Sequence, residues 1–447
     1  MFNDKTILKR MFKIGFPSLT GFFFYNIYML INMMWVAKLG KESVAAIGLF
    51  GSIFFIFSAI NEFGGSSSVP LISKKFGEKN YKRAGEVIVE SIYIKILTGA
   101  ISICFAFFLL KPILSFISNG NSELTLIAVK FGTPLLIFLP FAFIKYSVLT
   151  SFRCIEKSNY AMYLLTTEVI LNIILDPILI FGFGFIPAIG IYGPGVALII
   201  SQLIVIIIGL VILSMGLNNI KINLFKYHKI SKDYKKYLVK TGVPATCNSV
   251  LNTLSIPIIM KIVSSYGTDI VAIFSVMMQL VQAFISVLIG FGLGISSLIG
   301  ILNGENDRFN LKKTASIFIK LSTSVYIIIC SLIAVFSAFI VKLYVKNISL
   351  ESFTIAKHFI ILTGVLLFFE AIKATLMYIF GGTGQTKYNM ISNVSITWLF
   401  FIPGLLILKY HFNSNIYSIV YFLLLSKVIV TFFMMYYYKK EKWLQSI

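Results

Sequence analysis

The chain has 447 residues, of which 58% are hydrophobic and 13% are charged, whereas soluble domains carry about 25% charged residues. This composition excludes an ordinary soluble protein and indicates an all-α integral membrane protein that crosses a lipid bilayer many times. Basic residues outnumber acidic ones by 39 to 17, giving a net charge of +22. They lie in short loops between apolar segments, which is typical of membrane topology signals. We therefore expect no nucleic acid as a partner.

Twelve apolar segments are long enough to cross a bilayer as helices. We place them at residues 14–37, 46–72, 86–110, 126–149, 160–185, 192–217, 241–263, 271–300, 314–341, 355–380, 388–409 and 415–438. Lysines concentrate before the first span, in the second and sixth loops and after the last span, which predicts that both termini are cytoplasmic. The N-terminal residues have no short apolar core ending in a cleavage site, so no removable signal peptide is expected.

A polar segment at residues 218–240 divides the spans six and six, and a repeat is visible across it. One constant offset places Gly15 on Gly242 and Gly77 on Gly304, among other matches. Six spans lie between the starts of the two repeats, so both enter the membrane from the same side. We predict an N-terminal lobe at 1–217, a cytoplasmic linker at 218–240 and a C-terminal lobe at 241–447, with a substrate site between the lobes.

The most informative segment is LNIILDPILIFGFG, residues 171–184. Asn172 and Asp176 are four residues apart, so their side chains share one helix face, and Glu168 extends the same stripe. Pro177 cannot donate a backbone hydrogen bond, which leaves the carbonyl of Ile173 free. A carboxylate held in lipid is costly and usually serves ion or proton transport. The alternative is a kinked helix whose Asp pairs with a buried cation.

Motifs along the whole chain resemble one family. They are GKESVAAIGLF, PLISKKFGEKNYKRAGE, LNIILDP and GIYGPGVALIISQ, with TGVPATCNSV, FGLGISSLIGILNGEND and GGTGQTKYNM as second-half counterparts. In this order they resemble the multidrug and toxic compound extrusion (MATE) transporters of the multidrug/oligosaccharidyl-lipid/polysaccharide flippase superfamily. The resemblance implies a V-shaped bundle of twelve transmembrane helices in two pseudo-symmetric six-helix lobes. It also implies export of organic cations and other amphipathic compounds by antiport with H⁺ or Na⁺.

The resemblance further implies cation-coupling residues. Asn172 and Asp176 match the fifth-span residues that the family uses for coupling, and the family's first-span Asp falls on Asn32. Glu370 matches an acidic tenth-span residue, whose seventh-span companion falls near Asn252. Asn32 and Asp176 both lie ~16–18 residues from a cytoplasmic helix start, or ~24–27 Å along the helix, which supports their pairing. A single carboxylate there favours proton exchange over Na⁺ binding.

Two lysines lie within the spans close to these residues. Lys373 is three residues after Glu370 and could neutralise it as a purely structural pair. Lys145 has no acidic neighbour at that spacing, so it is expected to meet Glu62, Glu168 or Asp176, or to bind an anionic substrate. Polar, aromatic and methionine side chains suit promiscuous binding, and we predict that ten of them line the substrate cavity: Tyr25, Tyr28, Met29, Glu62, Lys145, Glu168, Asn252, Met278, Gln279 and Gln282. The alternative for each residue is ordinary helix packing.

No catalytic motif, metal-ligand spacing or glycine-rich phosphate loop is present. We therefore expect neither an enzyme nor a metal site, and no cofactor apart from H⁺ or Na⁺ as the coupling ion. The predicted protein is a monomer in a prokaryotic plasma membrane that transports small amphipathic or cationic molecules. One alternative is a lipid or lipid-linked oligosaccharide flippase. Such relatives usually carry extra spans and several Arg or Lys residues in the cavity, whereas this chain has twelve spans and one arginine, Arg153, at the margin of a predicted span. The other alternative is a membrane-embedded enzyme or scaffold, which would not require Asp176.

Overall fold

The computed structural model describes residues 4–117, 122–224, 229–344, 350–412 and 414–444, and the only β structure among them is two isolated bridges. The helices of the first half are α1 (Asp4–Ala37), α2 (Lys41–Ala59), α3 (Glu62–Gly77), α4 (Tyr81–Ile117), α5 (Ser122–Ile137), α6 (Leu139–Cys154), α7 (Ser158–Phe181), η1 (Gly190–Tyr192) and α8 (Gly193–Met215). The remaining helices are α9 (Lys232–Tyr237), η2 (Leu238–Gly242), α10 (Val243–Ser264), α11 (Thr268–Gly304), α12 (Arg308–Val335), α13 (Ser337–Tyr344), α14 (Leu350–Gly382), α15 (Thr386–Ser395), η3 (Ile396–Phe401), α16 (Ile402–Leu406), η4 (Ile407–His411), α17 (Ile416–Lys439) and η5 (Lys442–Leu444). Residues 225–228 of the predicted linker and the extreme termini lie outside the described residues.

Ten helical segments of the described chain are long and apolar enough to cross a membrane, and two bent pairs raise the number to twelve. The bent pairs are α2 with α3, at 48°, and α5 with α6, at 50°. The predicted all-α fold of twelve spans is therefore confirmed, and the chain is an integral, multi-pass membrane protein. The predicted spans at residues 46–72 and 126–149 are each bent at a break between two helices.

Each break has a local cause. At the first, the Lys95 ammonium donates hydrogen bonds to the backbone carbonyl of Asn61, at 2.5 Å, and to its side-chain oxygen. A cation at this point interacts favourably with the negative end of the α2 helix dipole. At the second, Pro140 lies at the start of α6 and has no N–H to continue the hydrogen bonds of α5.

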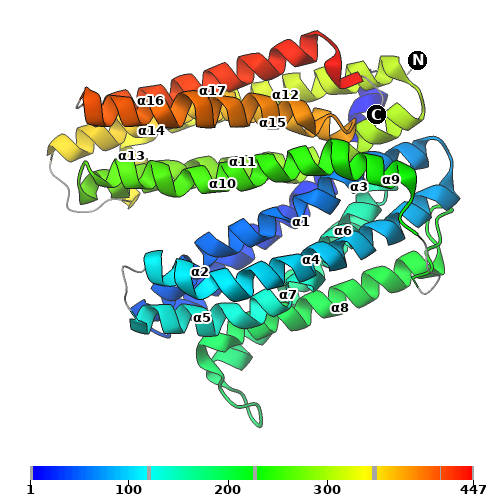
Figure 1. Cartoon of the computed structure of the whole chain (residues 1–447), viewed down its shortest axis with the longest axis horizontal. Helices are drawn as coiled ribbons and strands as arrows, with labels where there is room; N and C mark the ends of the chain where they lie inside the picture. Colours follow the sequence, from blue (N-terminus) through cyan, green and yellow to red (C-terminus); the bar gives the residue numbers. More distant parts are fainter. Residues whose placement is uncertain (1–3, 118–121, 225–228, 345–349, 413, 445–447) are drawn as a thin grey trace.

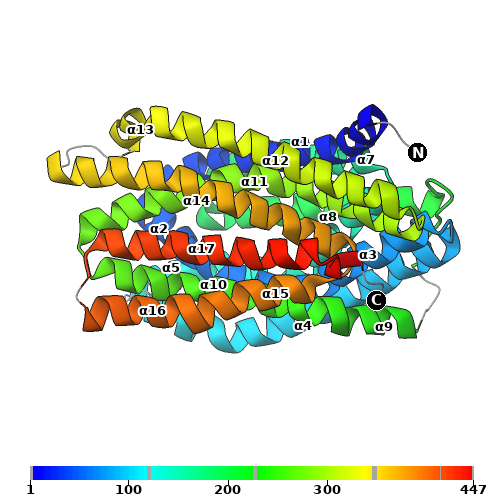
Figure 2. The same ribbon diagram turned by 90° about the horizontal axis from the view of Figure 1, so that it is seen from above.

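The helices run roughly along the long axis of the molecule (Figures 1 and 2), and Figure 1 shows them in two groups. Helices α1 to α8 make up one group, and α10 to α17 make up the other. The second group is built on one large hydrophobic core. The first group contains two smaller cores, one around Val148 and Phe152 and the other around Phe50 and Phe131.

Helix α1 connects the two groups through different parts of its length. Its first turns place Ile7, Met11 and Ile14 in the core of the second group. Farther along, α1 packs against α7 of its own group, where a Cβ on Gly21 would lie 2.9 Å from the Leu165 side chain. Together with the packing of α11 against α3, this helix holds the two groups together.

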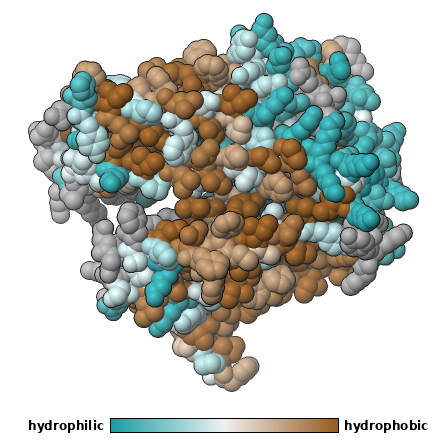
Figure 3. Space-filling model, viewed as in Figure 1, coloured by the Kyte–Doolittle hydropathy of each residue, from teal (hydrophilic) through white to brown (hydrophobic). Residues whose placement is uncertain are grey.

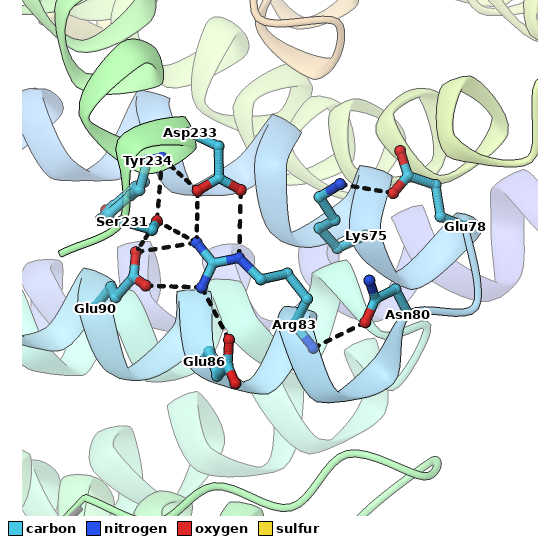
Figure 4. A network of polar contacts seen from close by, with 9 residues as sticks. All are labelled: Lys75, Glu78, Asn80, Arg83, Glu86, Glu90, Ser231, Asp233 and Tyr234. Carbon is cyan, nitrogen blue, oxygen red and sulfur yellow. Dashed lines mark hydrogen bonds and ion pairs between the residues drawn. The ribbon is translucent and has the colours of Figure 1, made fainter. Parts of the chain in front are cut away.

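The short helix α9, which lies within the predicted linker, is attached to the first group (Figure 4). Arg83 on α4 forms ion pairs with Asp233 of α9 at 2.8 Å and with Glu90 at 2.8 Å. Tyr234 and Tyr237 of α9 are buried in the core of the first group. The chain therefore passes to the second group through the π-helical turn η2, which follows α9 directly.

The two ends of the bundle differ in polarity (Figure 3). Hydrophilic residues gather at the end where α1 begins and where the α3–α4 and α8–α9 connections lie; we call this the lysine-rich end. An apolar band covers the middle of the molecule, as a membrane-embedded surface requires. At the opposite end the surface is hollowed between the two helix groups. The bundle is therefore V-shaped, closed at the lysine-rich end and open at the other.

Candidate functional site

The first candidate site lies between α1 and α7, around Asp176. The Asn32 amide donates a hydrogen bond to Asp176 Oδ2 at 3.1 Å and another to the Tyr28 hydroxyl at 2.8 Å. Asp176 and Asn172 are fully buried, and Tyr28 is 1% exposed. Helix α7 continues through Pro177 to Phe181, so the carboxylate is held on a helix that lacks one backbone hydrogen bond. The predicted contact between Asn32 and Asp176 is therefore present.

This site contains acceptor oxygens that nothing in the described chain satisfies. Asp176 Oδ1, Asn172 Oδ1 and Glu168 Oε2 are buried without a hydrogen-bond partner among the described residues. They come from successive turns of α7, with a rise of about 6 Å between neighbours. Buried acceptors are normally paired, so these oxygens could accept a proton or contribute to binding a small cation. Within the described residues, no group of three or more His, Cys, Asp or Glu side chains could hold a metal ion.

Lys145 meets one of the three acidic residues predicted for it. Its ammonium lies 2.7 Å from Glu168 Oε1, and both side chains are buried. The same ammonium lies 5.3 Å from the ring centroid of Tyr146 and 5.9 Å from that of Tyr25. Glu168 is thus neutralised by a cation, whereas the described residues direct only a neutral hydrogen-bond donor, Asn32, at the Asp176 carboxylate. The stripe on α7 therefore contains one paired and one unpaired carboxylate.

Glu370 in the second group lies between two lysines rather than beside one. It forms an ion pair with Lys373, as the spacing predicts, and a second one with Lys427 of α17 at 2.9 Å. Lys427 was not predicted, although a lysine in the middle of an apolar span is a visible signal. The cluster carries one more positive than negative charge. This arrangement favours a structural role for Glu370 over the coupling role that the family resemblance implies.

Glu62 and Lys95 form a third group of charges, at the break between α2 and α3. Glu62 accepts a hydrogen bond from Ser66. Lys95, which is 1% exposed, binds the adjacent Asn61 instead of forming a direct ion pair with Glu62. Lys95 was not predicted as a site residue, because it is a single charge within the apolar segment 86–110.

The other residues predicted to line the cavity differ in exposure. Tyr25 and Met278 are half-buried, and four of the side chains are exposed: Met29, Asn252, Gln279 and Gln282. Tyr28, Lys145 and Glu168 are buried, so in this conformation a substrate would not reach them without movement of the surrounding helices. Of the residues predicted to line the cavity, some are thus exposed at the surface of the helix groups, and others form a buried polar layer.

The V-shaped bundle, with ionisable side chains inside the spans of both halves, is typical of two-lobed helical membrane transporters. The family model for MatE matches residues 17–178 and again residues 244–407. The chain belongs to the MatE family. The two matches begin at Pro17 and Pro244, which are related by the same offset as Gly15 and Gly242 of the internal repeat.

Several known proteins are similar over most of their length. The probable multidrug resistance protein YoeA of Bacillus subtilis is 26% identical over 411 residues, which cover 90% of this chain and 87% of YoeA. The multidrug export protein MepA of Staphylococcus aureus is 25% identical over 337 residues, 75% of this chain and 73% of MepA. A crystal structure of MATE in the bent conformation has a TM-score of 0.85 at 19% identity, covering 98% of this chain and 96% of that one. An outward-facing multidrug resistance MATE transporter also gives 0.85 at 19% identity, with the same coverage.

Proposed function

We propose that this protein exports small amphipathic or cationic molecules across a prokaryotic plasma membrane by antiport with protons. Its family membership and the drug-export names of its relatives support transport. The relatives reported above are described as resistance and export proteins, which favours export over the flippase alternative. In this proposal the protein acts as a monomer, and its lysine-rich end faces the cytoplasm.

The observation that carries the proposal is the isolation of Asp176. Glu168 is paired with Lys145, and Glu370 is paired with two lysines. Among the described residues, Asp176 has no basic partner, and one of its oxygens has no hydrogen-bond donor. An ionised carboxylate in this environment is costly, and a bound proton would remove the cost.

The proposed cycle couples this protonation to the bend of α7. When Asp176 binds a proton from outside, its charge disappears and its hydrogen bond with Asn32 weakens. Helix α7 can then bend at Pro177, where a backbone hydrogen bond is missing, and narrow the cleft so that substrate leaves. Loss of the proton to the cytoplasm restores the charge and the starting conformation.

Reconstituted vesicles with an imposed pH difference and no Na⁺ would test the proposal. Wild-type protein is expected to export dye under these conditions. Asp176→Asn is expected to fold, but its rate of export should be lower by at least about tenfold, because an amide cannot exchange a proton. Asp269→Asn, which removes an exposed carboxylate at the start of α11, is the matched control and should transport normally. Undiminished export by Asp176→Asn would refute the proposal. Export that requires a Na⁺ gradient instead would reassign the coupling ion.

A further inference from the structure

Arg153, near the end of α6, is a buried arginine for which the described part of the chain supplies no counter-charge. It is 3% exposed, and its Nε has no hydrogen-bond partner there. Among the described residues, no carboxylate or carbonyl accepts a hydrogen bond from its guanidinium. The guanidinium lies over the face of Phe22, whose ring centroid is 5.9 Å from Cζ.

Two other arginines of the chain show how unusual this is. Arg10 binds Glu156 and Glu305, and Arg83 binds several acceptors at once (Figure 4). A buried guanidinium presents five donors and does not lose its proton. Leaving the buried Nε–H unpaired costs stability, so the position of Arg153 calls for a partner that comes from outside the chain.

The surroundings of Arg153 belong to both helix groups. Phe22 comes from α1, and the phenol groups of Tyr146 on α6 and Tyr378 on α14 lie within electrostatic range of the guanidinium. Tyr146 is 41% exposed. The adjacent Cys154 contacts Ser297 of α11, with 3.6 Å between Sγ and Oγ. Arg153 is therefore covered by the contact between the two groups and becomes accessible when they separate.

We propose that Arg153 binds an anionic group of the transported molecule, such as a carboxylate, while the aromatic rings around it contact the apolar part. The preferred substrates are then zwitterionic amphipathic molecules rather than simple cations. A carboxylate can accept two parallel hydrogen bonds from a guanidinium, which would satisfy the unpaired donors. The inference rests on the proposed export function and specifies the substrate class.

Binding to purified protein, without any gradient, tests this independently of proton coupling. Norfloxacin carries a carboxylate and an amine, whereas its ethyl ester keeps the amine and loses the negative charge. Equilibrium dialysis of wild-type protein should give tighter binding of norfloxacin than of the ester. Arg153→Gln should weaken norfloxacin binding by at least about tenfold, since a charge-assisted hydrogen bond is lost, and leave binding of the ester unchanged. Lys320→Gln, at an exposed lysine of α12, controls for loss of one positive charge.

Thermal unfolding of the ligand-free proteins shows whether the variant is folded. Arg153→Gln should raise the melting temperature, because an uncompensated buried charge is removed. The proposal would be overturned if wild-type protein bound norfloxacin and its ester equally well. It would also be overturned if Arg153→Gln lost the same affinity for both ligands, or lost no affinity for norfloxacin. Displacement of norfloxacin by phosphatidylglycerol in wild type but not in Arg153→Gln would assign the residue to a lipid headgroup and overturn it as well.

Discussion

Gly77 and Gly304 each lie against the backbone of the helix that carries the other. A Cβ on Gly77 would come 2.1 Å from the carbonyl oxygen of Ile301, and a Cβ on Gly304 would come 2.0 Å from that of Lys74. The repeat offset that relates Gly77 to Gly304 also relates Lys74 to Ile301. The contact is therefore reciprocal between repeat-related residues. It places the pseudo-two-fold axis between α3 and α11, at the lysine-rich end.

Gly304→Ala should open this contact, because the added methyl group would overlap a backbone oxygen that cannot move aside as a side chain can. Overpacking of this kind costs about 1–3 kcal/mol. Cys154 is a native reporter, since it is buried against Ser297 across the same interface. With the other three cysteines changed to Ser, maleimide labelling of Cys154 should accelerate by about tenfold in the variant.

Gly51→Ala is the matched control for this experiment. A Cβ on Gly51 would meet nothing within 4 Å, so the same change in a helix should leave Cys154 protected. Equal labelling of the Gly304→Ala protein and the wild type would show that the two helices tolerate the methyl group, and that the glycine contact does not hold the lysine-rich end closed.

Arg10 adds an electrostatic connection at the same end. Its guanidinium lies 2.6 Å from Glu156 of the first group and 2.7 Å from Glu305 of the second. These side chains are partly exposed, so each pair should contribute only about 0.2–1 kcal/mol. Arg10→Gln is expected to accelerate Cys154 labelling about two- to tenfold at low salt, and the difference should shrink at about 1 M salt.

Lys75→Gln provides the control for Arg10→Gln. Lys75 also forms an ion pair, at 2.8 Å with Glu78, but both residues belong to the first group. Its loss should leave Cys154 labelling at the wild-type rate. If both variants accelerate labelling equally, the effect comes from reduced charge at the lysine-rich end and not from the connection between groups.

The Glu370 cluster predicts unequal effects of neutralising its members. Glu370→Gln leaves the ammonium groups of Lys373 and Lys427 facing each other and should destabilise the protein by about 1–3 kcal/mol, less than a fully buried pair because the cluster is partly exposed. Lys373→Gln should cost less, because Glu370 keeps its partner Lys427 at 2.9 Å. Thermal unfolding in detergent measures both. Loss of pH-driven export in Glu370→Gln at unchanged stability would instead make Glu370 a coupling group.

The number of spans and the contact between Asn32 and Asp176 could be predicted because they depend on quantities that a sequence displays. Apolar length determines which segments cross the bilayer, and distance along each helix places both residues at one depth. The choice among three partners for Lys145 could not be made, since it depends on how α6 and α7 are rotated against each other.

Other features depend on tertiary contacts and left no local signal. The break beside Asn61 has no proline and relies on Lys95 from a different helix. The attachment of α9 to the first group relies on Arg83, which lies 150 residues from Asp233. In the sequence, α9 simply belongs to a lysine-rich polar segment. The isolation of Arg153 was equally invisible, because a missing partner becomes evident only when every neighbour is known.

The bent pairs give the two repeats different mechanical properties. The offset that relates Gly77 to Gly304 carries the whole pair α2–α3 onto the unbroken helix α11, and an offset one position longer carries the pair α5–α6 onto the unbroken α14. The first half also has separate cores on either side of its breaks, whereas the second has one. A displacement at the hollowed end would therefore be transmitted along the whole length of α11 and α14, so that the second half moves as a rigid body. In the first half the same displacement can be taken up by bending at two hinges, near Asn61 and Phe138.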